Sequence, residues 1–414
     1  MATLYEYLRD KTNARRYTQS LVKKSLQKIY NINHMKFARC LLPIVFAIAA
    51  CTQKGADAPR SDTAPPTQTK INIQTLAMGL EFPWGLALLA DGSALVTEKV
   101  GRLRLLKDGK LSAPISGVPK ALYGGQAGLF DVALHPDFAT NQYVYLSFAK
   151  GTEKDNATTL IRAKFDGKTL SEVTQIFETN PHKKGTNHFG ARILFLPDKT
   201  LLLSLGEGFD YKEEAQNLMS DLGKIMHLKD DGTPIEDQFV LPYANSSKRH
   251  LGIFTYGHRN PQGLAFDKAT NTIYEHEHGP RGGDEINAIV GGKNYGWPKI
   301  TYGVDYTGLP ISNKVAMAGM EQPLLYWVPS IAPSGMTFYD KDLFKNWKGD
   351  LLVSALAGKQ LRRVEIKAGK VLRQETFLTE LKTRFRNIIT APDGSIWVLT
   401  DEPQGRVLRL TPKG

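Results

Sequence analysis

The chain of 414 residues has only two cysteines and contains no apolar run of about 18 residues or more. Two cysteines exclude a disulfide-rich scaffold and a four-cysteine zinc site. The lack of a long apolar run excludes a polytopic membrane protein. Long helical periodicity is also nearly absent, and residues 213–226 are the best candidate for a short helix. Hydrophobic residues still make up 42% of the chain, enough for a packed core, which excludes wholesale disorder.

The charge is concentrated at the N-terminus. The chain has a formal net charge of +12 and a pI near 9.4, which would favour nucleic acid or an anionic membrane as a partner. Residues 1–50 hold nine of the 53 Lys and Arg and two of the 41 Asp and Glu. The remainder therefore carries 44 basic and 39 acidic residues, a net charge of +5. This modest excess requires no nucleic acid, and we expect none as a partner.

Residues 35–50 (MKFARCLLPIVFAIAA) have the order of a secretory signal, with basic residues first and an apolar segment after them. The apolar segment is too short to span a bilayer comfortably. The ending Ile48-Ala49-Ala50-Cys51 resembles a bacterial lipobox, so we expect a lipoprotein signal peptide and lipidation of Cys51. A plain signal peptide with a coincidental cysteine is the alternative. Thr52 after the cysteine favours an outer-membrane lipoprotein that faces the periplasm, held at the cell envelope only by its lipid.

Two further segments precede the folded domain. Residues 1–34 fit no signal pattern and represent either an over-long gene start, with Met35 as the true start, or an extended signal. Residues 51–70 are rich in Pro, Thr and Ala, which is typical of a flexible tether. Residues 71–414 are expected to form one domain.

That domain repeats one pattern six times: a small residue, an alternating apolar strand, a turn with Asp, and a second strand. The first strands are expected at residues 85–88, 128–134, 190–195, 263–266, 335–338 and 387–390. Repeats of this size predict an all-β, six-bladed β-propeller with four-stranded antiparallel blades. A β-sandwich or two β domains would not give sixfold self-similarity. The irregular spacing places long loops in blades three to five, around one mouth of the axial channel.

Residues outside the repeat cluster in these loops. Most of the loops precede a blade's first strand, so we expect them at the same end of the propeller, where they deliver Gln, His, Arg and Asn to one axial pocket. They are residues 124–128, 187–190, 257–263, 276–287, 294–298, 303–306, 329–334 and 384–386.

Three of these segments, taken in order, are highly specific: GHRNPQGLAF at 257–266, EHGPRGGDEIN at 277–287 and GKNYGWP at 292–298. They resemble the soluble, pyrroloquinoline-quinone (PQQ) dependent sugar dehydrogenases of the glucose/sorbosone dehydrogenase family, and most closely the aldose sugar dehydrogenase branch. The resemblance covers about residues 75–412. It implies oxidation of an aldose sugar at its anomeric carbon to a lactone, with hydride passing to C5 of PQQ. An external acceptor, such as a quinone or small redox carrier, would then take the electrons. The protein would be a monomer or homodimer.

The resemblance also assigns roles to individual residues. His188 matches the general base, which suits a group whose pKa lies near neutrality. Arg259, beside Asn260, matches the catalytic position next to the quinone. Arg384 and Arg386 stand two apart on a strand, so both side chains can reach one anion. The remaining matches to cofactor-contacting positions are Gln126, Gly279, Pro280, Asp284, Tyr306 and Phe385.

One position departs from the glucose dehydrogenase branch, which has a lysine for a PQQ carboxylate where this chain has Ala357. The aldose branch shows a similar change. We therefore expect backbone groups of Ala355, Leu356 and Ala357, or another cation, to replace it.

Calcium is the metal that the resemblance implies. One ion would join PQQ to the carbonyls of Gly279 and Pro280, and a second, structural ion would use Glu285 and the backbone of Tyr295. His276 and His278 share a strand face, but without a third spaced ligand they do not predict a transition-metal site. Trp297 and Tyr306 are candidates to stack on a sugar, and Trp297 is equally suited to the core.

Two other functions fit a propeller of this kind. A calcium-dependent lactonase or other hydrolase would need acidic residues converging on the axis. A non-enzymatic binding propeller of the envelope would not explain Arg259, Arg384 and Arg386.

Overall fold

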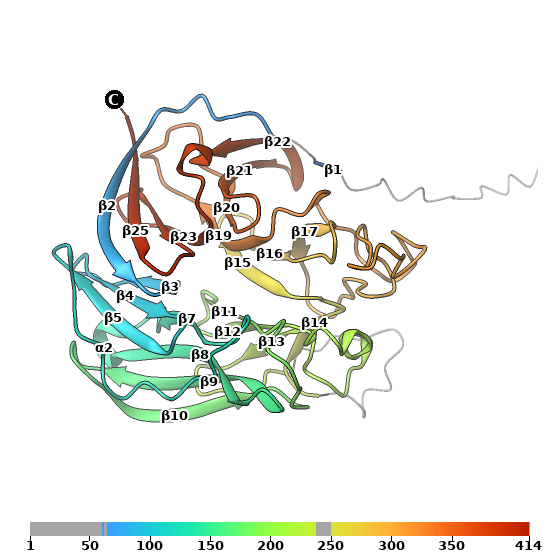
Figure 1. Ribbon diagram of the computed structural model, residues 1–414, viewed down its shortest axis with the longest axis horizontal. Helices are drawn as coiled ribbons and strands as arrows, with labels where there is room; N and C mark the ends of the chain where they lie inside the picture. The colour runs from blue at the N-terminus through green and yellow to red at the C-terminus, as the bar shows by residue number, and fades with distance from the viewer. Residues whose placement is uncertain (1–59, 62–63, 237–249, 414) are drawn as a thin grey trace, which may run out of the picture. The chain divides into compact units, whose positions relative to one another are not determined.

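Six sheets follow one another along the chain in the computed structural model and form the blades of a β-propeller (Figure 1). The structure describes residues 60–61, 64–236 and 250–413. The predicted signal peptide, Cys51 and residues 1–34 lie outside the described residues.

The first three blades contain strands in simple sequence order, from the innermost to the outermost. Blade one contains β3 (Pro83–Leu88), β4 (Ala94–Glu98), β5 (Arg102–Lys107) and β6 (Lys110–Leu111). Blade two contains β7 (Leu129–Leu134), β8 (Tyr143–Thr152), β9 (Asp155–Phe165) and β10 (Leu170–Glu178), with the short helix α2 (Phe138–Asn141) after β7. Blade three contains β11 (Gly190–Phe195), β12 (Leu201–Leu205), β13 (Lys224–Leu228) and β14 (Ile253–Tyr256).

The last three blades include two strands from the N-terminal part of the chain. Blade four contains β15 (Pro261–Asp267), β16 (Thr272–Glu277), β17 (Asp284–Ile289) and β18 (Leu325–Trp327), and β1 (Arg60–Ser61) pairs parallel to β18. Blade five contains β19 (Pro333–Tyr339), β20 (Asp350–Ala355), β21 (Gln360–Lys367) and β22 (Lys370–Phe377). The 3-10 turn η2 (Thr379–Leu381) leads to blade six, which contains β23 (Phe385–Thr390), β24 (Ile396–Thr400), β25 (Gly405–Pro412) and β2 (Ile71–Leu80).

The ring is closed by strands from the two ends of the domain. β2 runs antiparallel to β25, with Ile71 opposite Pro412 and Leu80 opposite Gly405, so blade six holds both ends together. The innermost strands of neighbouring blades contact each other, including β23 with β3. The predicted six-bladed propeller is confirmed, and each predicted first strand overlaps an innermost strand.

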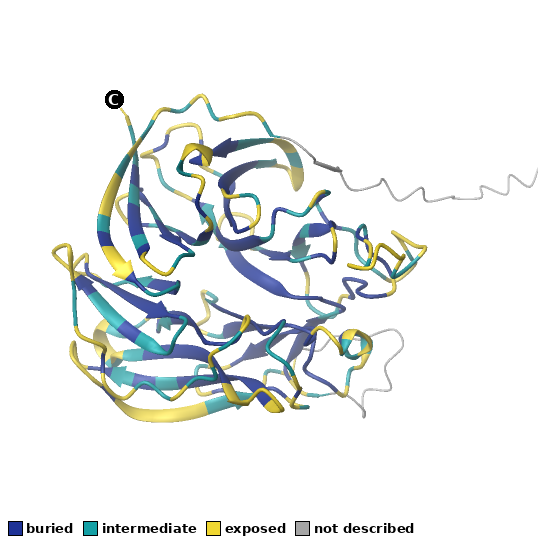
Figure 2. Ribbon diagram, viewed as in Figure 1, coloured by how far each residue is buried: buried dark blue, intermediate teal, exposed yellow. Residues whose placement is uncertain are grey.

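The hydrophobic core is divided among the interfaces between blades. Each of six clusters combines residues of two consecutive blades, for example Leu95 with Val144 between blades one and two, and Leu264 with Ile225 between blades four and three. Every residue of β4, β12, β13 and β20 is buried, because both faces of a middle strand are covered by neighbouring blades. The outermost strands β2 and β10 carry many exposed residues, whereas β22 mixes exposed, intermediate and buried residues (Figure 2).

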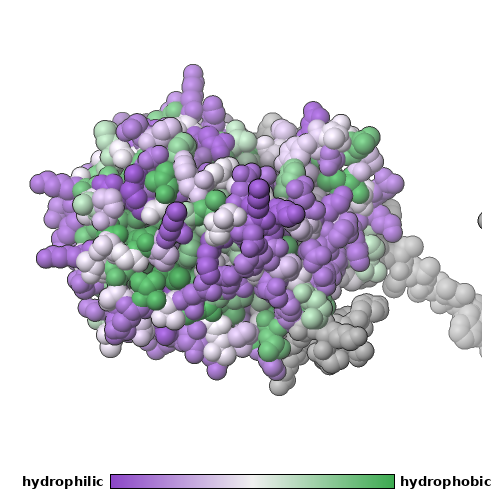
Figure 3. Space-filling model, turned by 60° about the horizontal axis from the view of Figure 1, so that its bottom comes forward, coloured by the Kyte–Doolittle hydropathy of each residue, from purple (hydrophilic) through white to green (hydrophobic). Residues whose placement is uncertain are grey.

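The surface in Figure 3 is mostly hydrophilic, with smaller apolar areas between the polar side chains. No helix among the described residues is long and apolar enough to cross a membrane.

Two local expectations need revision. The helix proposed for residues 213–226 is only a single 3-10 turn, η1 (Lys212–Gln216), and β13 begins at Lys224. Lys224 explains the chain's path there: its buried ammonium group donates to the carbonyls of Glu214, Ala215 and Leu222 and holds the turn against the strand. Residues 64–70 belong to the proposed tether. They follow the edge of β22, where Thr67 N–H donates to Thr376 O and Thr376 N–H donates to Pro65 O, each at 2.8 Å.

Candidate functional site

A cavity of about 590 Å³ lies on the propeller axis, at the mouth where the innermost strands begin. All six blades contribute to it, through Trp84, Gln126, Gly190, Gln262, Ala332 and Arg386 in chain order. An aromatic cluster forms one wall, with ring centroids of Trp84 and Phe130 at 5.5 Å and of Phe130 and Phe189 at 5.4 Å. The loops that the sequence predicts at one mouth therefore do converge.

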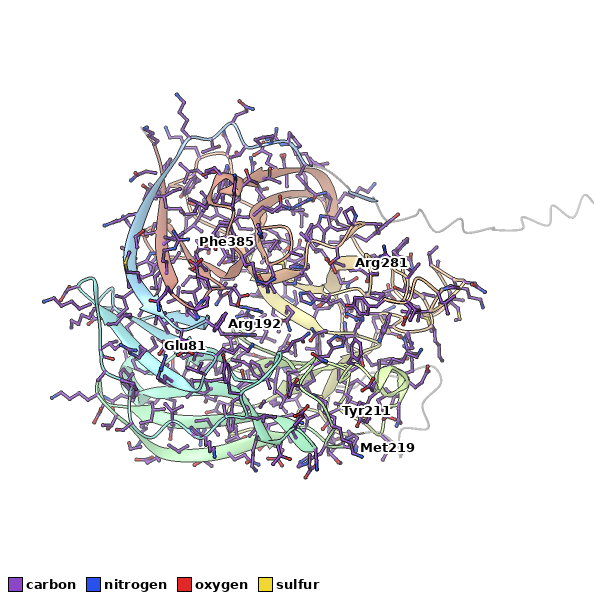
Figure 4. The ribbon with its side chains drawn as sticks, in the orientation of Figure 1. Glu81, Arg192, Tyr211, Met219, Arg281 and Phe385 are labelled. Carbon is purple, nitrogen blue, oxygen red and sulfur yellow. The ribbon has the colours of Figure 1, made fainter. Side chains whose placement is uncertain are left out.

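Arg192 ties the blades together below this cavity and is labelled near the centre of the ring in Figure 4. Its guanidinium group is buried and donates to Asp131, to Gln262 O and to Ser334 O, which belong to blades two, four and five. Because this buried guanidinium group is hydrogen-bonded to three other blades, it is held rigidly and gives the cavity a fixed base.

His188 precedes β11 and is only 2% exposed. Its backbone has φ of +50°, an unfavourable conformation for a residue with a Cβ atom. The Gln126 side chain accepts its N–H at 2.9 Å, and the His188 Nδ1 atom lies 2.8 Å from Glu207 Oε1. Gly206 permits this approach, since a Cβ there would lie 2.4 Å from His188 O. The ring is therefore held by contacts on both backbone and side chain.

Glu207 determines which nitrogen of the imidazole is free. Burial, with the nearby charges of Arg259 and Lys183, lowers the pKa of His188 well below 6.5, so the ring is neutral at neutral pH. Burial raises the pKa of Glu207 to about 7. When Glu207 is ionised it accepts a hydrogen bond from Nδ1–H, which leaves Nε2 without a hydrogen and therefore free to accept a proton. Sequence reasoning missed Glu207, although a carboxylate directly after the apolar strand Leu201–Leu205 was a usable signal.

Arg259 lies close enough to His188 for its charge to lower the pKa of that ring, and it is 4% exposed. Its Nη1 donates to His278 O at 3.1 Å and to Gly279 O at 2.6 Å, and its Nη2 donates to the hydroxyl of Tyr306 at 3.4 Å. The guanidinium carbon lies 5.3 Å from the Trp297 ring centroid. The Nε atom is buried without a protein partner. Arg259 therefore keeps a donor for a further acceptor, while Trp297 packs beneath it and is 7% exposed.

The side chains of Asn260 and Asp284 form hydrogen bonds that hold the neighbouring loops in place. Asn260 Oδ1 accepts from Gly190 N–H at 3.2 Å and Gln262 Nε2 at 3.3 Å. The Asp284 carboxylate accepts from the Gly279 N–H at 2.9 Å, and its other oxygen accepts from three groups of residues 330–332 at 2.6–2.8 Å. The expectation that Asp284 contacts a cofactor needs correction, because its acceptor sites are already used by the loops it shapes.

Three cations border the cavity. Arg384 and Arg386 both bind one carboxylate, Asp401, at 2.8 and 3.2 Å. Burial alone would raise the pKa of Asp401, but the two guanidinium groups outweigh it and lower the pKa. Lys99, which follows β4, also lines the cavity, and burial together with Arg386 and Arg384 lowers its pKa. Two carboxylates, Asp401 and Glu402, beside three cations still leave a positive excess that suits an anionic ligand.

Lys99 is the cation that sequence reasoning did not find. It enters from blade one, whereas the lysine of the glucose dehydrogenase branch would stand at Ala357 in blade five. Leu356 lines the cavity, but its N–H donates to Ala332 O at 2.9 Å and is not free. Ala355 is fully buried in β20, and Ala357 is exposed. The N–H of Leu356 is therefore not available to a ligand, whereas a contact between the cofactor and other atoms of Leu356 stays a prediction.

Phe385 also needs correction as a cofactor contact. Its side chain is 0% exposed and belongs to the core between blades five and six. The alternation of a strand places Arg384 and Arg386 toward the cavity and therefore turns the residue between them away.

A group of buried acids lies on β16 and β17, next to Arg259. His258, Glu275 and Glu277 offer ligand atoms that all lie within 4.8 Å of one another. Glu285 stands opposite Glu277, and Asn287 stands opposite Glu275. Burial and the charge of Glu277 raise the pKa of both Glu275 and Glu285, and Glu275 Oε1 has no hydrogen-bond partner.

This group fits a divalent cation that prefers oxygen ligands, because three adjacent carboxylates without a cation are costly to bury. Tyr295, the predicted backbone ligand, is close: its ring stacks on His258 with centroids 4.9 Å apart. Glu275, Glu277 and His258 were not predicted. The spacing Glu275-His276-Glu277 on one strand was the signal, since alternate residues share a face.

The other predicted metal positions behave differently. The Gly279 carbonyl already accepts from Arg259, which uses one of its two lone pairs, and the Pro280 backbone is buried beside it. His276 is buried against Gly263, whereas His278 Nε2 donates to Pro333 O at 2.7 Å. The two histidines therefore contact different groups. Among the described residues, the only metal-ligand cluster is the acidic one.

Comparison with known proteins identifies the family that the sequence matches. The family model described as glucose/sorbosone dehydrogenase matches residues 80–409. The aldose sugar dehydrogenase YliI of Escherichia coli is 40% identical over 350 residues, which cover 83% of this chain and 93% of that protein.

Two solved structures are similar over the same region. The apo form of the soluble aldose sugar dehydrogenase from E. coli has a TM-score of 0.79 at 38% identity and covers 83% of this chain and 100% of its own. The PQQ-bound aldose sugar dehydrogenase from Streptomyces coelicolor has a TM-score of 0.69 at 29% identity, with 84% and 100% covered.

Proposed function

Because the chain belongs to the glucose/sorbosone dehydrogenase family, an oxidoreductase family, we propose that it oxidises aldose sugars at the anomeric carbon to lactones, using PQQ. The observation that carries the proposal is the neutral His188, oriented by buried Glu207 beside a cavity edged with cations. When bound, PQQ supplies the two-electron acceptor for the hydride of the anomeric carbon, and an external carrier takes the electrons afterwards.

The chain's own residues fit this cofactor. PQQ has three carboxylates and two quinone oxygens, and Arg384, Arg386 and Lys99 supply the positive charge for such an anion. We propose that Arg259, whose buried Nε–H has no protein partner, donates to an oxygen on which negative charge develops. His188 Nε2 takes the proton of the C1 hydroxyl, and ionised Glu207 stabilises the resulting imidazolium.

We propose calcium as the metal, with Glu285, Glu277 and the backbone of Tyr295 among the structural ligands. The closely spaced buried acids of β16, with Glu275 Oε1 left without a hydrogen-bond partner, support this site. Gly279 and Pro280 offer carbonyl oxygens for a second ion, which would polarise the quinone.

The test is reconstitution. The purified protein, with added PQQ and Ca²⁺, is offered a panel of aldoses and an artificial dye, and dye reduction is followed. The failure of every aldose to reduce the dye would sink the proposal. Lactone hydrolysis without PQQ would instead favour the hydrolase alternative. That alternative needs acidic residues at the axis, whereas the carboxylate between Arg384 and Arg386 is already paired with both arginines.

Two histidines of one segment allow a matched comparison. His188→Ala should retain PQQ binding and lose turnover by about 10²–10⁴-fold, the usual cost of a missing general base. His182→Ala is the control, because His182 is a half-exposed residue paired with Asp155 and Glu178. If His188→Ala keeps activity within about tenfold of His182→Ala, the base is a different residue.

We also propose that the protein is a lipoprotein of the cell envelope, anchored through Cys51. The lipobox-like sequence supports this location. Metabolic labelling with radioactive palmitate should mark the protein but not the Cys51→Ser variant. Sequencing of the mature N-terminus of that variant reports whether a plain signal peptide is cleaved instead.

A further inference from the structure

Phe209 stands two residues after Glu207 and combines two unfavourable features. Its φ is +73°, in the left-handed region that disfavours residues with a Cβ atom, and its side chain is 41% exposed. An exposed phenylalanine adds little to the core, and glycine would adopt this backbone without strain. A strained, exposed aromatic residue directs attention to what its ring contacts.

The left-handed turn at Phe209 brings both its backbone N–H and its aromatic ring into contact with residues of the site. The backbone N–H hydrogen-bonds to the Glu207 carboxylate and lowers its pKa, opposing part of the effect of burial. The ring meets His188 edge to face, with centroids 5.1 Å apart and an interplanar angle of 76°. Phe209 is therefore in contact with both members of the proton-accepting pair.

A second ring extends this surface. Tyr306, 57% exposed, lies nearly parallel to Phe209 at an interplanar angle of 26°, with centroids 6.1 Å apart. Its hydroxyl accepts from Arg259 Nη2 at 3.4 Å. The pair thus bridges the two sides of the site, from His188 to Arg259, and presents apolar ring surface to solvent.

We propose that Phe209 and Tyr306 form an aromatic platform that binds the C–H face of an aldose ring and directs its C1 hydroxyl to His188 Nε2. The inference rests on the proposed function and makes Phe209 a specificity-determining residue. A sugar ring has an apolar face of C–H groups, which suits an exposed aromatic surface, and polar edges, which suit Gln126 and Arg259. An electron acceptor has no need to approach the base, whereas the substrate must touch it.

The position of Phe209 gives an unusually clean substitution. Phe209→Gly removes the ring and relieves the backbone strain, so Tm should stay level or rise. In the reconstituted holoenzyme the KM for the aldose should rise about tenfold, while kcat changes by less than about threefold, because aromatic contacts contribute mainly to binding. Phe209→Tyr retains the ring and should restore the KM. Met219→Gly, at another exposed apolar residue, is the control and should leave the sugar KM unchanged.

Several results would overturn the platform. An unchanged sugar KM in Phe209→Gly, whether or not Tm falls, means that the ring is structural. A raised KM for the dye with an unchanged KM for the sugar means that it serves the electron acceptor.

A separate measurement distinguishes failure of the aromatic platform from failure of the proposed function. Saturation-transfer NMR detects aldose binding to the purified protein whether or not it turns over. Wild type should show contacts to the sugar's C–H protons that Phe209→Gly lacks. If wild type binds no aldose, the platform is wrong even where dye reduction with another substrate is found.

Discussion

The Glu207→Gln variant tests whether a buried carboxylate orients His188. Glu207 is 0% exposed, and burial raises its pKa from 4.5 to about 7. Between these two values the folded protein holds a proton that the unfolded chain has released. The free energy of unfolding must therefore fall as the pH rises through this window. At about 1.4 kcal/mol per pKa unit, the loss from this one group amounts to about 3 kcal/mol above pH 7.

Glutamine cannot titrate, so the variant lacks this loss. We expect the difference in unfolding free energy between Glu207→Gln and wild type to shift by about 2.5 kcal/mol in favour of the variant between pH 5 and pH 8. Urea unfolding of the protein without added cofactor at the two pH values measures it. Other titrating groups cancel in the difference, and the exposed Glu213→Gln serves as the control. A difference that does not change with pH would refute the assignment of a raised pKa to Glu207.

Activity gives a second consequence of the same pair. In wild type, protonation of Glu207 below about pH 7 removes the negative charge that stabilises the His188 imidazolium, so kcat/KM should fall on the acid side with that pKa. Glutamine still accepts from Nδ1–H but carries no charge. The variant should lose about 10–10²-fold in kcat/KM, the contribution of a charged hydrogen bond, and its acid limb should move to lower pH. An acid limb that stays near pH 7 in the variant would assign it to another group.

Three further predictions concern the ligands. Arg386→Met should raise the Kd for PQQ about 10–100-fold in a fluorescence titration, because a charged hydrogen bond is lost, whereas Arg409→Met, on an outer strand, should not. Lys99→Met should weaken PQQ binding by about 3–10-fold and make it less sensitive to salt; an unchanged salt dependence would remove Lys99 from the site. Ca²⁺ at about 100 times its Kd should stabilise the fold by about 2.7 kcal/mol, and Glu285→Gln should abolish the accompanying rise in Tm; an equal rise in the variant would exclude this ligand.

Much of the fold followed from periodicity. A strand buried on both faces needs apolar residues throughout, and a hairpin needs a residue that tolerates positive φ, as Gly92 does with φ of +83°. These are local requirements, so the sequence displays them. The proposed helix at 213–226 failed for the opposite reason: the turn there is held by Lys224, whose buried ammonium group acts across the loop.

The site was only partly readable. Arg384 and Arg386 lie two apart on one strand, and that spacing alone predicts a shared direction, which in turn excludes Phe385 from the cavity. Lys99 is far from them in sequence, and nothing in its neighbourhood marks it as a cavity residue. Asp284 was predicted from its match to a cofactor-contacting position of the family, but its carboxylate binds residues 330–332, in the connection between blades four and five.

The sequence by itself determined the six repeats, the strands that begin them and the residue types that gather near one mouth, because these depend on neighbours along the chain. Only the tertiary structure decided the pairing of His188 with Glu207, the position of Phe209 over the histidine and the meeting of the acids on β16 and β17 with His258. Those arrangements depend on strand pairing within blades three and four, which brings residues of different strands together, and on burial, which excludes the water that would otherwise screen their charges.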